Sequence, residues 1–520
     1  MSRRIASSAP FAPFARFPSL APFALFAAVA CGPKPIANPP LQPPPPETPP
    51  VTMPAPPPID PLGPKPEAAA PSPFAPPTPI VYTTPGGLTV WLVERHTLPI
   101  VAMTIAVSSG AGSDPKGKQG LAWVTANMLD EGAGKLGAIA FAKQVEFLGA
   151  SLHTGASLDY AHASLSVVKK NLTPAFALFA DVVARPRFDA IEWKRVHELW
   201  TNDLAARVRE PQSVAQIVAM RALYGEGAYG HPVDGLTASA KGTTLADVRA
   251  FYKTAWRPDA ATLVVVGDVT RTELDPLIAA GLADWKAPAT AKPALVTPPP
   301  PPPPVAKGGS WPRVALVDRA DAPQSVIALV RAGRGAGDPD APVLTRVNIA
   351  LGGSFTSRLN QDLREEHGWS YGASSRVALL RGTGSIVASA AVQTEHTGDA
   401  LRALVKDMEE FARTGLTDDE VTKTRFVARG ELVDMFESSE SAAMRLARDA
   451  ALGLGPDYEP KASVTRDTAG KDDLARAVHG FDPKDGYIVV VGPRSKLDKQ
   501  LAAIGVDAIE IRDAEGTITK

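Results

Sequence analysis

The sequence is short of three features that would assign it to a common functional class. Positive and negative side chains nearly balance, with 54 Lys and Arg against 55 Asp and Glu, which excludes the one-signed field that holds nucleic acid or attracts an acidic substrate. Cysteine occurs once in 520 residues, so no disulfide can form within the chain. No histidine has a second one three or four residues away, so neither H-x-x-E-H nor H-E-x-x-H occurs. What remains is a globular protein that is 45% hydrophobic and long enough for roughly two to four domains.

The N-terminus is typical of an export signal. Arg3 and Arg4 precede an apolar stretch that is too short and too often interrupted by proline for a membrane-spanning helix. The small residues 28–30 then lead directly to Cys31, the single cysteine. This arrangement resembles the lipidation site of bacterial lipoproteins, so we expect residues 1–31 to be a signal peptide and Cys31 to carry a lipid. Gly32 favours the outer membrane, and an ordinary secretory peptide cleaved near an unmodified cysteine is the alternative.

Proline divides the rest of the chain. Residues 32–78 are dominated by proline and alanine and have no apolar period, so they are expected to form an extended tether. A second proline run at 297–307 separates two stretches of nearly equal length, 79–296 and 308–520. We expect each stretch to be a domain.

The two expected domains are copies of one pattern. Each ends in a helical segment, a proline and a β-branched apolar run closed by glycine. The interval from Pro258 to Pro483 is 225 residues, and that from Gly267 to Gly492 is also 225. Upstream, Asp114 precedes its counterpart Asp338 by 224 residues. An almost constant offset over this length indicates an internal duplication.

Within a copy, strand patterns come first and helical patterns follow. The first copy predicts strands at 88–94, 100–107 and 157–168 from their β-branched residues. Apolar spacing predicts helices at 118–131, 138–149, 172–184, 189–208 and 211–224. The predicted fold class is α+β: two duplicated α/β sandwiches, each with an antiparallel-rich sheet covered by helices on one face.

The order of these motifs identifies a resemblance. The strand pair leading to GSDPKGKQGLA, the helix GLAWVTANML followed by DEGAGKL, and the later YGEGAYGHPVDG and RPDAATLVVVGDV resemble the insulinase/pitrilysin family of zinc metallopeptidases. The resemblance runs from about residue 80 to 515 and implies that the two domains form half of a peptidase chamber. Active members carry H-x-x-E-H on the first helix, where two histidines bind zinc and the glutamate activates water.

This chain lacks those zinc-binding residues. Trp123 and Asn127 occupy the histidine positions, Ala126 occupies that of the glutamate, and Asp203 falls at the position of the third ligand. One carboxylate cannot hold zinc where three protein ligands are usual. We therefore expect this chain to bind no catalytic zinc.

The second copy retains residues that the resemblance makes functional. In IALGGSFTSRLNQDLREEHGWSYGASS, Arg364 and Tyr371 match the family's paired arginine and tyrosine, which hold substrate and stabilise charge on the attacked carbonyl. A guanidinium and a phenol suit that task, and Gly352 and Gly353 would let the backbone approach a bound strand. The alternative is an arginine paired with a neighbouring glutamate and a tyrosine in a core.

A domain without zinc ligands joined to this pair resembles one subunit of the family's heterodimeric bacterial peptidases. The resemblance implies a zinc-bearing partner subunit and an extended peptide as substrate. The N-terminal signal predicts a location on the periplasmic side of the bacterial envelope, with attachment through Cys31. No cofactor would be bound by this chain. The alternative is a peptide-binding or assembly subunit with the same fold and no part in hydrolysis.

Overall fold

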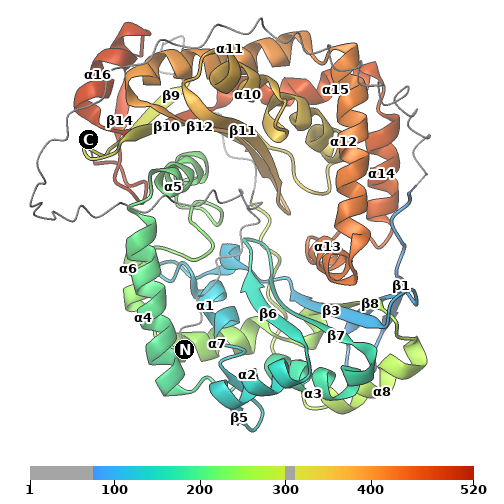
Figure 1. Cartoon of the computed structure of the whole chain (residues 1–520). Helices are drawn as coiled ribbons and strands as arrows, with labels where there is room; N and C mark the ends of the chain where they lie inside the picture. Colours follow the sequence, from blue (N-terminus) through green and yellow to red (C-terminus); the bar gives the residue numbers. More distant parts are fainter. Residues whose placement is uncertain (1–73, 299–310, 507, 520) are drawn as a thin grey trace, which may run out of the picture. The chain divides into compact units, whose positions relative to one another are not determined.

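The computed structural model describes residues 74–298, 311–506 and 508–519, which belong to one compact unit (Figure 1). The expected signal peptide, Cys31 and most of the expected tether lie outside these residues, as does most of the expected linker.

The first half of the chain builds a six-stranded sheet in the order β1-β2-β8-β3-β7-β6. Only β2 and β8 pair in parallel, and every other neighbouring pair is antiparallel. The strands are β1 (Ile80–Thr83), β2 (Thr89–Glu94), β3 (Ile100–Val107), β6 (Ser151–Ala156), β7 (Ala161–Val168) and β8 (Ala261–Gly267).

The second half builds a similar sheet in the order β14-β9-β13-β10-β12-β11, except that its outer strand β14 pairs in parallel with β9, where β1 pairs antiparallel with β2. The strands are β9 (Arg313–Asp318), β10 (Gln324–Gly333), β11 (Ser370–Leu379), β12 (Gly384–Gln393), β13 (Tyr487–Gly492) and β14 (Ile509–Ile511). Strand β13 pairs in parallel with β9, as β8 does with β2, and antiparallel with β10, as β8 does with β3. The glycines that revealed the duplication, Gly267 and Gly492, end β8 and β13.

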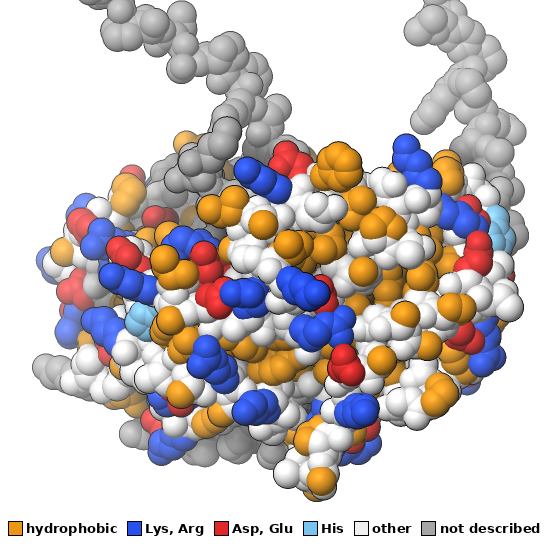
Figure 2. Space-filling model, turned by 90° about the horizontal axis from the view of Figure 1, so that it is seen from below, with side chains coloured by type: hydrophobic (Ala, Val, Ile, Leu, Met, Phe, Trp, Pro, Cys, Tyr) orange, Lys and Arg blue, Asp and Glu red, His pale blue; other side chains and the backbone are white. Residues whose placement is uncertain are grey.

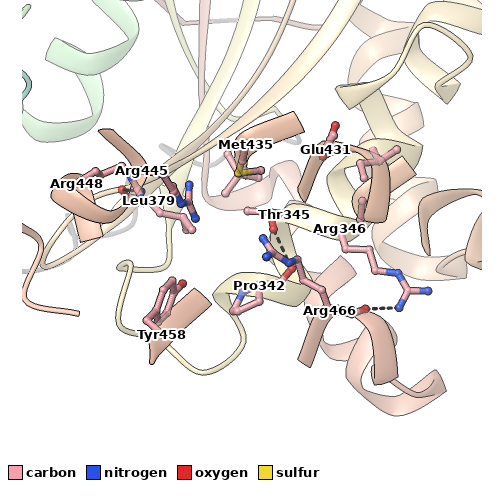
Figure 3. A pocket seen from close by; sticks show the side chains of 13 residues that line it. Pro342, Thr345, Arg346, Leu379, Glu431, Met435, Arg445, Arg448, Tyr458 and Arg466 are labelled. Carbon is pink, nitrogen blue, oxygen red and sulfur yellow. Dashed lines mark hydrogen bonds between the residues drawn. The ribbon is translucent and has the colours of Figure 1, made fainter. Parts of the chain in front are cut away.

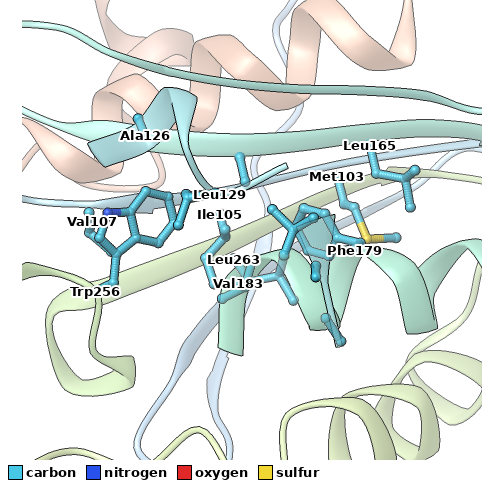
Figure 4. Packing of buried hydrophobic residues seen from close by; sticks show 14 of the residues in the cluster. Met103, Ile105, Val107, Ala126, Leu129, Leu165, Phe179, Val183, Trp256 and Leu263 are labelled. Carbon is cyan, nitrogen blue, oxygen red and sulfur yellow. The ribbon is translucent and has the colours of Figure 1, made fainter. Parts of the chain in front are cut away.

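Each sheet buries one face under helices of its own half. In the first half, alternate residues of the strands, such as Met103 and Ile105, pack against α3 residues that include Phe179 and Val183 (Figure 4). The helices of this layer and its surroundings are α1 (Leu121–Asn127), α2 (Ala138–Phe147), α3 (Leu172–Ala184), α4 (Ala190–Arg207), α6 (Thr237–Gly242), α7 (Leu245–Ala255) and α8 (Arg271–Gly281). The second sheet is covered in the same way by α9 (Ala341–Asn348), α11 (Thr397–Thr414), α15 (Lys471–Val478) and α16 (Arg494–Ala503).

The opposite face of each sheet is covered by the other half. Helix α5 (Pro211–Tyr224), from the first half, packs on the second sheet, where Val214 and Val218 meet Val326 and Val489. Helices α12 (Asp418–Glu437) and α13 (Ser439–Ala451), from the second half, pack on the first sheet around Trp91 (Figure 1). The predicted fold class is confirmed, and the sheets are buried on both faces by this exchange of helices.

Several element boundaries differ from the prediction. Helix α1 covers only part of the predicted 118–131, because Gly120 begins it in a left-handed conformation with φ 97° and a short hairpin, β4 (Gly132–Ala133) with β5 (Leu136–Gly137), follows it. The predicted strand 157–168 begins only at Ala161, after the separate strand β6. Two π-helical segments, η4 (Ile349–Gly353) and η5 (Gln361–Glu366), flank the short α10 (Arg358–Asn360).

One face of the molecule carries side chains of both charges (Figure 2). On the face shown in Figure 2, Lys and Arg side chains alternate with Asp, Glu and hydrophobic side chains. Among the described residues, no helix combines the length and the apolar character needed to cross a bilayer.

Candidate functional site

The first part of the candidate site is α1, which is held in place by Asp114. The carboxylate accepts hydrogen bonds from the backbone N–H of Gly120 (2.6 Å) and Ala122 (2.8 Å), so it caps the start of the helix. Burial raises the pKa of Asp114 to about 8, and the hydrogen bonds from the helix N-terminus oppose that rise. The sequence showed Asp114 only as a marker of the duplication, and its capping role was missed.

The three degenerate zinc positions on α1 are filled by packing. Trp123 lies beside Trp200 of α4, with 6.0 Å between the ring centroids. Ala126 is fully buried in the core of the first half (Figure 4). Asn127 donates its Nδ2–H to the carbonyl of Trp123 at 2.8 Å, so its amide is bound to its own helix.

Asp203, at the position of the third ligand, is exposed on α4. Burial is the main cause that raises the pKa of the neighbouring Asp234, and repulsion by Asp203 adds a smaller increase. Within residues 74–298, 311–506 and 508–519, no three His, Cys, Asp or Glu side chains come together around a point where a metal ion could bind.

The second part of the candidate site lies in the other half, where η5 leads into β11. Arg364, on η5, is 36% exposed, and its guanidinium carbon lies 4.6 Å from the centroid of the Phe355 ring. Its Nε is 3.4 Å from Glu365 Oε1, so the pairing with a neighbouring glutamate does occur. Phe355 is 66% exposed, and the sequence did not indicate its role as a platform for the guanidinium.

Tyr371 stands at the beginning of β11, the edge strand of the second sheet, and is 89% exposed. The pairing of β11 with β12 shifts register between Ser370 and Ala373, so Tyr371 lies within a bulge. A bulge at a sheet edge re-aims a side chain. The alternative of a tyrosine buried in a core is therefore wrong.

The two glycines occupy different environments. Gly352, at the end of η4, is buried, and a Cβ there would lie 2.3 Å from the backbone nitrogen of Ser375 on β11. Its lack of a side chain thus serves the close packing of η4 on β11 within this chain. Gly353 is exposed, and its backbone lies near Asn348.

The site therefore consists of two separate parts in the described residues. The first half offers a helix without metal ligands, and the second half offers an exposed phenol and a half-exposed guanidinium at the end of an edge strand. Such a pair of donors can hold a peptide carbonyl, but neither group is a nucleophile for peptide hydrolysis at neutral pH.

Comparison with known proteins assigns both halves of the chain to the same peptidase family. Residues 89–235 match the family described as insulinase (peptidase family M16), and residues 243–427 match the peptidase M16 inactive domain. An uncharacterized zinc protease of Mycobacterium tuberculosis is 28% identical over 368 residues, which cover 70% of this chain and 82% of the relative.

Two solved structures are similar in fold. The peptidase M16 inactive domain from Pseudomonas fluorescens matches with a TM-score of 0.73 and 25% identity over 80% of this chain and 98% of that one. A protease from Helicobacter pylori matches with a TM-score of 0.71 and 19% identity, over 80% of this chain and 99% of its own. The matched domains and the ligand-free first helix together show that the chain belongs to the insulinase family, peptidase family M16, as a non-catalytic member.

Proposed function

We propose that this chain is the substrate-clamping subunit of a heterodimeric zinc metallopeptidase that degrades peptides. The observation that carries the proposal is the exposed Tyr371 at the bulged start of an edge strand, directly after the segment that bears Arg364. An exposed tyrosine in a bulge contributes little to the packing of its own chain. A role toward a ligand accounts for its position.

The two side chains suit one task. Arg364 supplies a permanently charged donor group. Its contact with the Phe355 ring restricts the positions that the guanidinium can take. Tyr371 supplies a phenolic O–H. Aimed at a peptide carbonyl, both donors bind more strongly as negative charge develops on the oxygen, so they favour the transition state over the bound substrate.

The proposed place for an extended peptide is the start of β11, beside the exposed Tyr371. Further along this edge strand the backbone is already occupied, since the carbonyls of Ser375 and Leu379 accept hydrogen bonds from Asn348 and Arg448, and the Ala373 N–H donates to Asn360 Oδ1. A peptide held at Tyr371 therefore depends on the side chains of Arg364 and Tyr371, since Tyr371 is the second residue of β11.

The zinc and the water it activates would come from a partner subunit that carries H-x-x-E-H. The residues of this chain at the corresponding positions, Trp123, Ala126 and Asn127, do not fit a zinc ion, since none is a usual ligand and their side chains are engaged in packing or in the helix. We further propose, from residues 1–31, that the chain is exported and held on the periplasmic side of the outer membrane by a lipid on Cys31.

The proposal is tested by isolating the protein from its own cells with its natural N-terminus. Gentle solubilisation of the envelope and affinity capture should yield a stoichiometric partner bearing H-x-x-E-H, with chelator-sensitive peptidase activity in the pair and in neither chain alone. A captured chain with no such partner and no activity would favour the peptide-binding or assembly subunit.

A pair of variants then tests the clamp itself. In the assembled complex, Arg364→Ala combined with Tyr371→Phe should lower kcat/KM by roughly 100-fold or more, the range found when donors to a developing oxyanion are removed. The matched control is Arg402→Ala, which removes an exposed arginine of α11 and should leave activity unchanged. Unchanged activity in the double variant would contradict the clamping role.

A further inference from the structure

A cavity of about 190 Å³, partly open to solvent, lies in the second half, between β11 and helices α9, α12, α13 and α14 (Tyr458–Thr468). Four arginines line it. Arg445 and Arg448 approach from one side with Tyr458, and Arg346 and Arg466 from the other (Figure 3). The volume is large enough for a small polyatomic ion together with water.

The buried charges around this cavity do not balance. Two carboxylates lie among the four guanidinium groups, Asp449 and Glu459, and both are almost completely buried. Glu431 also lines the cavity, but it is exposed. Burial raises the pKa of Asp449, which weakens its contribution as an anion. The interior therefore carries an excess of positive charge.

Three of the four arginines donate hydrogen bonds to these carboxylates. Arg445 donates from Nε to Glu459 Oε1 at 2.7 Å, and Arg466 donates from Nη2 to Glu459 Oε2 at 3.4 Å. Arg448 donates from Nη1 to Asp449 Oδ1 at 3.0 Å. Among the described residues, neither Arg445 Nη1 nor Arg466 Nη1 forms a hydrogen bond within the chain, so both remain available as donors.

Among the described residues no carboxylate forms an ion pair with Arg346, and Asp467, which acts on its charge from a greater distance, is already paired with Arg425 and Arg429. Arg346 is 1% exposed, and its two terminal nitrogens donate only to backbone carbonyls, those of Arg466 (2.6 Å) and Val421 (3.0 Å). Its Nε is buried without a hydrogen-bond partner. A buried charge without a counter-ion is strongly unfavourable, and proteins normally pair such a charge.

We propose that this cavity binds a small oxyanion, of the size and charge of inorganic phosphate or of a carboxylate group, as the missing counter-ion of the arginine cluster. The anion would accept hydrogen bonds from the free guanidinium nitrogens of Arg445 and Arg466 and lie in the field of Arg346. Because the walls of the cavity come from β11 and from α12 and α13, a bound anion would tie the strand that bears Tyr371 to the helices that cover the first sheet. This inference does not depend on the proposed peptidase partner.

The test is binding of inorganic phosphate to the full chain. Equilibrium dialysis against labelled phosphate should give one site per chain, and the thermal midpoint should rise and saturate over the same concentration range. Sodium chloride at matched ionic strength should not reproduce the rise, and sodium acetate in a parallel titration distinguishes a carboxylate site from a phosphate site. No saturable binding of either oxyanion, or an equal rise with chloride, would overturn the proposal.

Two arginine variants locate the site. Arg346→Met removes the unpaired buried charge without breaking an ion pair, so the chain should still fold and its dissociation constant for the anion should rise at least about tenfold. Arg494→Met removes a partner of Asp498 on α16, outside the cavity, and should leave binding unchanged. Wild-type affinity in the Arg346 variant would place any anion elsewhere and contradict the inference. The dialysis of the unmodified chain decides the question if a variant does not fold.

Discussion

Arg381 and Asp159 form a buried ion pair that joins the two halves of the chain. The backbone N–H of Arg381 donates to Asp159 Oδ2 at 3.0 Å, and its guanidinium donates to the carbonyls of Asp159 and Ala451, both at 2.8 Å. The side chains are 5% and 2% exposed, and the hydroxyl of Tyr229 also donates to Asp159. One arginine of the second half thus binds the turn that connects β6 and β7 in the first.

Removing one member of this pair should weaken the whole structure. Arg381→Met leaves Asp159 buried with an uncompensated charge, for which we expect a loss of about 3–5 kcal/mol in the free energy of unfolding. Urea denaturation followed by tryptophan fluorescence measures it. The control is Arg429→Ala, which breaks the partly exposed pair with Asp467 and should cost at most about 1 kcal/mol. An equal loss of stability in the two variants would show that the buried pair contributes no more than a surface pair and does not link the halves.

The packing of η4 on β11 predicts a second effect, at Gly352. In Gly352→Ala the added Cβ would meet the backbone nitrogen of Ser375 at 2.3 Å, and neither segment can move without disturbing the sheet. We expect a loss of roughly 1–3 kcal/mol in stability. Activity of the assembled complex should also fall, because β11 carries Tyr371.

The matched control for Gly352 is another glycine of the same half. Gly430 lies in the middle of α12 with no atom within 4 Å of an added Cβ, so Gly430→Ala should stabilise the chain by roughly 0.5–1 kcal/mol. A loss of stability in Gly352→Ala together with a gain in Gly430→Ala would confirm that the close approach of Ser375 requires glycine at position 352. A change of stability in the same direction in both variants would refute this explanation.

Restoring the zinc motif should not restore a zinc site. In the triple variant Trp123→His, Ala126→Glu and Asn127→His, the new glutamate occupies a fully buried core position, and the packing of Trp123 on Trp200 is lost. Asp203 is exposed on α4, so a third ligand is not directed at the new histidines. Zinc content after dialysis should stay well below one ion per chain, with no chelator-sensitive peptidase activity. Stoichiometric zinc would show that only the three substitutions separate this chain from an active member.

Much of the fold could be predicted from residue patterns alone. The predicted helices 172–184 and 211–224 coincide with α3 and α5, and the β-branched runs before Gly267 and Gly492 are the strands β8 and β13. These segments have a strong apolar period or a continuous apolar run, so local sequence determines their type. The duplication was visible because proline and glycine fix backbone geometry at the same points of both halves.

What the sequence did not predict depends on contacts between distant residues. The apolar residues of α5 indicate a buried face, but not that the face belongs to the sheet of the other half. Arg346 and Arg381 look like ordinary charged residues until the fold removes them from water. For the candidate site, the residue identities came from the sequence, whereas the exposure of Tyr371 comes from a bulge that no local pattern marks.

His162 predicts how stability depends on pH. It lies on β7 opposite Gly155 of β6, its Nδ1 is buried without a hydrogen-bond partner, and burial lowers its pKa to about 4 from the ordinary 6.5. Between these two values the unfolded chain binds a proton that the folded chain does not. The contribution of His162 is therefore fully present above pH 6.5 and is lost as the pH falls toward 4.

The measurement compares urea midpoints of the wild type and His162→Phe from pH 7.5 to 4.5. Other groups titrate in both proteins, so the difference between the two curves isolates His162. The wild type should lose more stability than the variant as the pH falls through 6.5, because the phenylalanine ring fills the space beside Gly155 without a proton to bind. His479→Gln, at an exposed histidine, is the control and should follow the wild-type curve. Parallel curves for the wild type and His162→Phe would mean that the imidazole is protonated equally in both states, and that its burial between the strands does not restrict its charge.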